Sequence, residues 1–155
     1  MQLALLIDHP EAIPLVARWY FDDHGHEIPG NSFEATCARI QGKLNRDIPP
    51  LHVFAISDGR PVGVAQWKRY EMPEYPDKEH WLGSVFVTPE HRGKSIGGLL
   101  ANKVAEIAQS KGVKELYLST ERLDGGFYLR AGWTPYERTI SRSDEVLVMI
   151  KTLGA

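Results

Sequence analysis

A basic loop that contains glycine joins an apolar segment to an amphipathic one between Trp81 and Gly112. The apolar run of Val85, Phe86 and Val87 predicts a buried strand, Pro89 ends it, and residues 96–110 have the spacing of an amphipathic helix. A strand that leads through such a loop into a helix N-terminus leaves main-chain N–H groups free beside partial positive charge. This arrangement predicts a site for an anion such as a phosphate group. The loop residues are Arg92, Gly93, Lys94, Ser95, Ile96, Gly97 and Gly98.

Two nucleotide-binding motifs can be compared with this loop, and neither fits. Gly93, Lys94 and Ser95 match the end of a P-loop, but that motif needs a glycine five residues earlier, where Thr88 stands. The dinucleotide pattern G-x-G-x-x-G fails because the loop glycines have the wrong spacing. The anion is therefore not expected to belong to a nucleotide bound in either of these ways.

The loop has a different match. Arg92-x-x-Ser95-x-Gly97, preceded by Val87-x-Pro89, resembles the coenzyme A loop Q/R-x-x-G-x-G/A of the GCN5-related N-acetyltransferase (GNAT) family. Farther along, the segment FYLRAGW from Phe127 to Trp133 is similar to the F-Y-x-x-x-G-F/W motif of that family. The resemblance is sharp over residues 81–133. Ser95 replaces the middle glycine of the family pattern, which suits serine if its dihedrals are helical, and Glu121 stands where the family often has asparagine.

The resemblance implies a fold and a reaction. The fold is α/β (α+β), with a central, mixed and mostly antiparallel sheet whose middle strands splay apart and which helices flank. Residues 1–155 would form a single N-acetyltransferase domain. The implied reaction moves an acetyl group from acetyl-CoA, without a metal, directly to a primary amine of a small molecule or of a peptide or protein N-terminus. The alternative is a non-catalytic module that binds or senses acyl-CoA, because fold does not determine function.

The resemblance also assigns roles to residues. The main-chain N–H groups of the loop would hold the pyrophosphate, with added charge from Arg92 and Lys94. The pantetheine arm would pair with residues 85–87 like an extra strand, and an N–H near Val87 would polarise the thioester oxygen. The expected cofactor-binding residues are Val85, Phe86, Val87, Arg92, Gly93, Lys94, Ser95, Ile96, Gly97 and Gly98.

Candidate catalytic residues lie on either side of the loop. Tyr128 is the expected general acid, because a phenol with a pKa of about 10 can protonate a departing thiol whose pKa is about 8.5. The sequence offers no unique base for the amine. Glu79 and His80 immediately precede the cofactor strand and are the leading candidates, while Glu71, Glu74 and Glu121 are weaker ones. Cys37 shares helical spacing with apolar neighbours and reads as a core residue, so direct transfer is favoured over a covalent intermediate.

The acceptor is less well defined by the sequence. The segment 71–80 carries Glu71, Glu74, Asp77 and Glu79 against Lys78 alone, which favours a cationic acceptor by an attraction that salt would screen. A small polyamine, an aminoglycoside-like compound and a protein or peptide amine all remain open.

Composition excludes several other classes of protein. The 155 residues are 43% hydrophobic and 25% charged, with a net charge of −2, so there is no basic footprint for nucleic acid. The single cysteine cannot form an intrachain disulfide, and His24 and His26 make too weak a set to predict a metal site. No apolar stretch is long enough to span a membrane, so we expect a cytoplasmic protein. Its oligomeric state stays open, with a homodimer as one option.

Hydrophobic spacing predicts the elements that position these residues. Strands are expected at 3–7, 51–57, 61–69, 85–87, 115–119, 134–141 and 145–153, with Asp58-Gly59 as the turn between the second and the third. Helices are expected at 11–21, after the Ser32 cap, at 96–110 with Leu99 on its inner face, and at 127–131 with Phe127 in the core.

Overall fold

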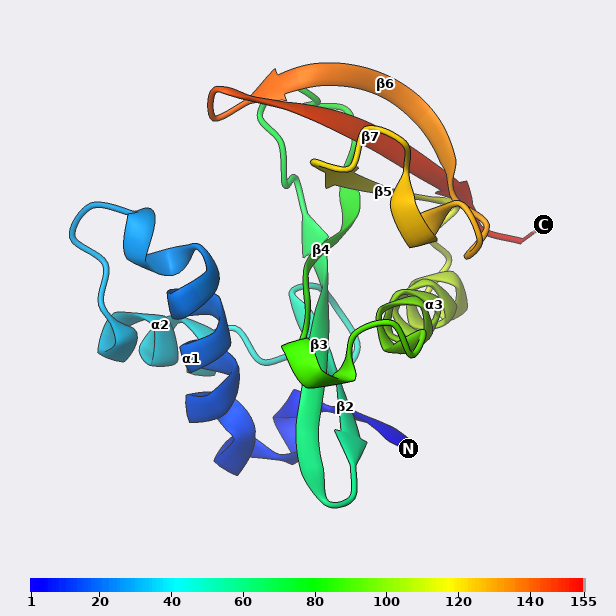
Figure 1. The fold of residues 1–155 in the computed structure, drawn as a ribbon. Helices are drawn as coiled ribbons and strands as arrows, with labels where there is room; N and C mark the ends of the chain where they lie inside the picture. Colours follow the sequence, from blue (N-terminus) through cyan, green and yellow to red (C-terminus); the bar gives the residue numbers. More distant parts are fainter. Residues whose placement is uncertain (155) are drawn as a thin grey trace.

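The computed structural model describes residues 1–154 and places seven strands of that range in one sheet, in the order β1-β2-β3-β4-β5-β7-β6 (Figure 1). Every neighbouring pair is antiparallel except β4 and β5, which are parallel. The strands are β1 (Gln2–Leu5), β2 (Leu51–Ser57), β3 (Arg60–Arg69), β4 (His80–Val87), β5 (Glu115–Thr120), β6 (Thr134–Ser141) and β7 (Asp144–Thr152). The helices are α1 (Ile13–Asp23), α2 (Phe33–Gln41) and α3 (Ile96–Ser110), with single 3-10 turns at Leu6–Asp8, Pro10–Ala12, Gly25–Glu27, Pro89–His91 and Gly126–Tyr128.

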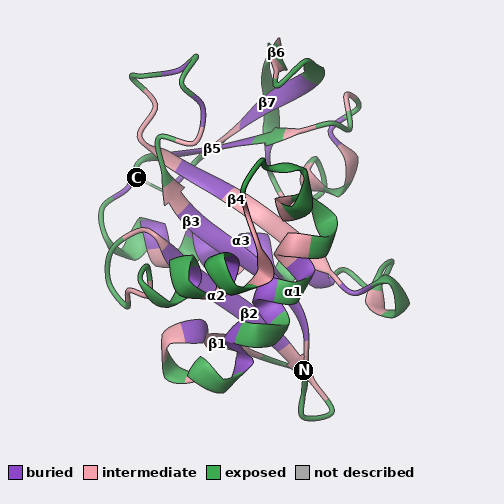
Figure 2. Ribbon diagram, turned by 90° about the vertical axis from the view of Figure 1, so that its left-hand side faces the viewer, coloured by how far each residue is buried: buried purple, intermediate pink, exposed green. Residues whose placement is uncertain are grey.

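The helices cover opposite faces of the sheet. The α1–α2 pair lies on one face of β2, β3 and β4, and α3 lies on the other (Figure 1). Figure 2 shows the buried residues concentrated in the central strands and on the inner sides of the helices. The core beneath α3 includes Leu100, Val104, Val53 and Trp67, whereas the core beneath α1 includes Val16 and Phe54 among other apolar residues.

Local sequence signals explain where several elements begin and turn. The Ser32 hydroxyl accepts a hydrogen bond at 3.0 Å from the Ala35 N–H and so caps α2, as the sequence predicts. Pro14 lies in the first turn of α1, where its missing N–H costs little. Asp58 and Gly59 both have positive φ angles and form the tight turn between β2 and β3.

Three expectations from the sequence need correction. The first strand ends at Leu5, because residues 6–8 form a 3-10 turn. The expected short helix at 127–131 is reduced to the 3-10 turn Gly126–Tyr128, which begins at the second of two consecutive glycines with positive φ angles. Leu99, expected on the inner face of α3, is exposed, and the buried residues of that helix include Ile96 and Leu100 instead.

The two central strands diverge almost as soon as they meet. β4 and β5 are paired at the single position Trp81 with Tyr117, and the rest of each strand runs on without a partner in the other. The expected splay of the middle strands is thereby confirmed. It leaves a wedge between β4 and β5 that opens toward the N-terminus of α3.

Candidate functional site

The loop between β4 and α3 presents a run of free main-chain donors. Within residues 1–154, no main-chain N–H from Gly93 to Gly98 donates a hydrogen bond. The first turn of α3 contains no acidic residue, and a Cβ built on either Gly93 or Gly98 would meet nothing within 4 Å. Free donors, the positive end of a helix and open space together make residues 93–98 a site that an anion can approach closely, and we call this site the anion seat.

Ser95 departs from the helical conformation that would suit a serine. Its φ of 63° and ψ of 17° lie in the left-handed region, immediately before α3 begins. Gly93, two residues earlier, also has a positive φ of 78°. The glycine usual at the Ser95 position would adopt this backbone without steric cost, whereas serine adopts it against its Cβ.

The two basic residues of the loop have different surroundings. The Arg92 Nε donates to the Val87 carbonyl at 2.9 Å, and its guanidinium lies 5.6 Å from the centre of the Phe86 ring. Arg92 therefore ties the loop to the end of β4 while its charge stays beside the free donors. Lys94 is exposed and makes no ion pair with any other residue from 1 to 154.

The predicted cofactor strand is only half-buried, not fully buried as expected. Val85, Phe86 and Val87 all have intermediate exposure, because they border the wedge where β5 has turned away. Val85 and Val87 pack toward the core beneath α3, while Phe86 faces the core beneath α1. A strand with one unpaired edge can accept an extended ligand as an additional strand.

A β-bulge lies within this strand. Val64 of β3 pairs with Phe86 and Gln66 pairs with Gly83, so Ser84 and Val85 together oppose a single residue of β3. Ser84 has a positive φ of 51°. Neither bulge residue has a partner in β5, and the bulge therefore lies at the inner end of the wedge.

Tyr128 lies near the loop because its neighbour Phe127 packs against Gly97 in the first turn of α3. A Cβ on Gly97 would lie 2.9 Å from the Phe127 Cζ, so this glycine lets the turn Gly126–Tyr128 dock on the first turn of α3. Phe127, expected in the core, is instead 37% exposed. Burial raises the pKa of Tyr128 to about 12, and its hydroxyl makes no hydrogen bond within residues 1–154.

Glu79 lies elsewhere. It precedes β4, at the end of the strand opposite the loop, and forms an ion pair with Arg69. The Glu79 carboxylate is 3.6 Å from the Nε2 atom of His80. The other ring nitrogen of His80, Nδ1, accepts a hydrogen bond from the Trp67 indole N–H at 3.1 Å. The structure thus brings Tyr128 and the loop together but not Glu79 with them.

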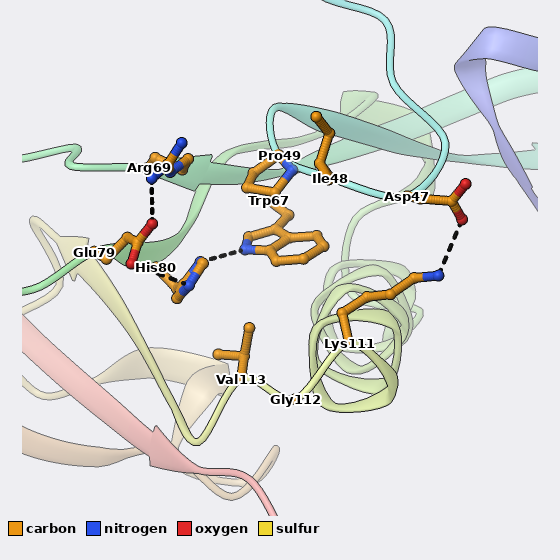
Figure 3. Close-up of a pocket in the computed structure, with 10 residues that line it drawn as sticks. All are labelled: Asp47, Ile48, Pro49, Trp67, Arg69, Glu79, His80, Lys111, Gly112 and Val113. Atoms are coloured by element: carbon orange, nitrogen blue, oxygen red, sulfur yellow. Dashed lines mark hydrogen bonds and ion pairs between the residues drawn. The ribbon is translucent and has the colours of Figure 1, made fainter.

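A pocket of about 470 Å³ surrounds this second group (Figure 3). Glu79, His80 and Trp67 line one side, and Lys111 reaches Asp47 at 3.0 Å across the other. Because Lys111 follows the last residue of α3, the pocket lies at the opposite end of that helix from the anion seat.

The acidic segment 71–80 is less negative than its sequence suggests. Glu71 pairs with Lys68 at 2.9 Å, Asp77 pairs with Lys78 at 3.3 Å, and Glu79 pairs with Arg69. Neighbouring cations therefore offset most of the charge that would attract a cationic acceptor.

Comparison with known proteins agrees with this geometry. The family model described as "Acetyltransferase (GNAT) family" matches residues 13–133. The chain belongs to the GNAT family. GNAT proteins transfer acetyl groups from acetyl-CoA, which is therefore the cosubstrate here. No curated protein sequence matches the chain.

Solved GNAT structures share the fold at low sequence identity. An aminoglycoside 6'-N-acetyltransferase complexed with coenzyme A is 16% identical in sequence and superposes with a TM-score of 0.75. The match covers 100% of this chain and 98% of that enzyme's chain. A ribosomal-protein-alanine N-acetyltransferase from Brucella melitensis is 17% identical with a TM-score of 0.73, covering 99% and 100%. An aminoglycoside 6'-N-acetyltransferase from Enterococcus faecium is 16% identical with a TM-score of 0.72, covering 100% and 98%.

The residues present suit this cosubstrate. The free donors at 93–98 and the open space at Gly93 and Gly98 match the needs of a diphosphate, and the unpaired edge of β4 suits an extended arm. The bulge is a functional feature that was not expected from the sequence, and the signal that indicates it is Gly83, a glycine inside an apolar strand. Among the described residues, no helix combines the length and apolarity that crossing a bilayer requires.

Proposed function

We propose that this GNAT protein is an N-acetyltransferase whose acceptor is a primary amine of a small molecule or of a peptide or protein N-terminus. The observation that carries the proposal is the run of free main-chain donors at 93–98, close to both the unpaired edge of β4 and the Tyr128 turn. Bound acetyl-CoA supplies a thioester that a neutral amine attacks at its carbonyl carbon, with the thiol as leaving group.

The residues of the chain divide the work among three places. The loop donors and Lys94 hold the diphosphate. The edge of β4 from Val85 to Val87 aligns the arm, and a main-chain N–H at this edge stabilises negative charge on the carbonyl oxygen. Tyr128 donates its hydroxyl proton to the departing sulfur and regains one from solvent, and solvent takes up the proton that the amine nitrogen loses as it is acylated.

The raised pKa of Tyr128 fits this role. A pKa of about 12 keeps the hydroxyl protonated throughout the physiological range, so the donor is always loaded. The hydroxyl has no hydrogen-bond partner within residues 1–154, which leaves it available to the sulfur.

Calorimetry with CoA and with acetyl-CoA tests the cofactor site, and thiol release from acetyl-CoA tests turnover. The acceptors to compare are an aminoglycoside, a polyamine and a peptide with an N-terminal alanine. We expect binding of both cofactors and turnover with at least one amine. Binding without turnover on any amine would favour the sensing module, and absence of binding would refute both readings.

Tyr128→Phe tests the acid. We expect turnover to fall about tenfold or more, with CoA affinity nearly unchanged, because the ring remains and only the proton donor is lost. The measurement is kcat and the CoA dissociation constant of each variant. An unchanged kcat would remove Tyr128 from the mechanism.

A further inference from the structure

Helix α1 reaches across to the bulge of β4. The Tyr20 hydroxyl donates a hydrogen bond to the Ser84 carbonyl at 3.2 Å, joining residues 64 positions apart in the sequence. The Gln66 Nε2 donates to the Tyr20 oxygen, also at 3.2 Å. Because the Tyr20 oxygen accepts from Gln66, its own proton is directed to the carbonyl. The bulge is therefore held from α1 as well as from β3.

This contact fixes a peptide group and not only a carbonyl. The Ser84 carbonyl and the Val85 N–H belong to one peptide unit, which is planar and trans, so they point in opposite directions. Since the carbonyl points to Tyr20 on α1, the Val85 N–H points away from α1.

A second contact from the same helix flanks the bulge. The Trp19 ring stacks on Phe86 with ring centres 5.4 Å apart and an interplanar angle of 26°. Adjacent residues of α1 thus contact the Ser84–Val85 peptide and the residue that follows it in β4.

The surroundings of Tyr20 make the contact strong. Gln66 is buried, and beside it His52 is 4% exposed with neither ring nitrogen partnered within residues 1–154. Burial raises the pKa of Tyr20 above its usual value, so the hydroxyl keeps the proton that it donates. Hydrogen bonds in such a low-dielectric region are stronger and better ordered than those at the surface.

We propose that Tyr20 is a positioning residue for acetyl transfer, which holds the Ser84–Val85 peptide so that the Val85 N–H faces the thioester oxygen. This proposal rests on the proposed function and adds to it an element, α1, that contributes without touching the reacting atoms. Loss of the hydroxyl would let the peptide rotate, and the N–H would no longer be aimed at the developing charge.

The direct test observes the Val85 amide. Protein labelled with 15N-valine is titrated with CoA and with acetyl-CoA, and Val85→Ile assigns the resonance. We expect acetyl-CoA to shift the Val85 amide proton downfield relative to CoA, because only the thioester offers it a carbonyl. In Tyr20→Phe this difference should fall by about half or more, while the CoA dissociation constant stays within about twofold of the parent value.

Turnover gives an independent test, measured at saturating acetyl-CoA with the best amine acceptor. Tyr20→Phe should lower kcat about tenfold with little change in the KM for acetyl-CoA. Gln66→Met, which removes the donor to Tyr20, should lower kcat less. The double variant should be no slower than Tyr20→Phe alone, because Gln66 acts through Tyr20. Tyr117→Phe is the matched control, since it removes the hydroxyl of another tyrosine, one that donates to Glu115 and not to β4.

Each outcome decides between readings. An acetyl-dependent shift that persists in Tyr20→Phe, or a kcat equal to that of Tyr117→Phe, would overturn the positioning role. Additive losses in the double variant would also overturn it, because they would indicate separate packing defects. If glycine signals of the loop respond to CoA but Val85 never distinguishes acetyl-CoA, this inference fails while the proposed function stands. If nothing responds to either ligand, both fail.

Discussion

Ser95 holds a left-handed backbone at the point where the loop becomes α3, and its φ of 63° places its Cβ against the following peptide. Ser95→Gly should raise the free energy of unfolding by about 0.5–1 kcal/mol, because the relief of strain exceeds the flexibility that glycine adds to the unfolded chain. Urea unfolding measures the change. Gly93→Ala is the opposite control: it has a φ of 78° with open space around the Cβ, so it should destabilise through backbone strain alone. A destabilised Ser95→Gly would show that the left-handed conformation is not strained.

Glu79 is adjacent to the expected cofactor strand β4 but lies next to its first residue, whereas the anion seat follows its last. Its ion pair with Arg69 and its place opposite the anion seat predict that Glu79→Gln lowers kcat less than about threefold. Steady-state kinetics over a range of pH values checks this. A loss of about 100-fold, with the CoA dissociation constant unchanged, would instead establish Glu79 as a base that acts through water.

At the scale of elements, the docking of the turn Gly126–Tyr128 on α3 depends on the absence of one side chain. Gly97→Ala would place a Cβ 2.9 Å from the Phe127 ring and should lower the free energy of unfolding by about 1–2 kcal/mol. Gly98→Ala, with nothing within 4 Å, should instead raise it by about 0.5–1 kcal/mol through helix propensity. Urea unfolding of the two neighbours compares them directly. Equal effects would mean that the Phe127 contact contributes nothing.

Elements set by local patterns could be predicted, and contacts between distant elements could not. The spacing of residues 96–110, the Ser32 cap and the Asp58-Gly59 turn each depend on neighbours in sequence, and the structure confirms them. The left-handed backbone of Ser95 could not be predicted, because serine rarely adopts it. The Tyr20–Ser84 contact could not be predicted either, because it joins residues 64 positions apart and no periodicity in either segment indicates it.

At the scale of the whole molecule, one buried histidine links folding to pH. Burial, helped by the charges of Lys68 and Lys43, lowers the pKa of His52 to about 4. In the unfolded chain His52 binds a proton near pH 6.5, whereas in the folded chain it stays neutral down to a pH of about 4. The free energy of unfolding is therefore not reduced by this histidine above pH 6.5, and it falls as the pH drops from 6.5 toward 4. The expected loss between pH 7.5 and 5.5 is roughly 1.4 kcal/mol. Urea unfolding at both values should show that His52→Phe removes this share of the pH dependence, and an unchanged slope would contradict the assignment.

The single point of pairing between β4 and β5 gives each of these strands two unlike edges. The edge of β4 that faces β3 is paired with that strand along most of its length. The edge that faces the wedge is paired with β5 only at Trp81, so the N–H groups that follow on this edge have no acceptor in β5. Deuterium from solvent should therefore enter at neighbouring positions of β4 at alternating rates, fast where the N–H points into the wedge and slow where it points to β3. A cosubstrate lying in the wedge would slow the fast set and leave the slow set as it was, so the exchange pattern along one strand would report occupancy of the site without any acceptor present.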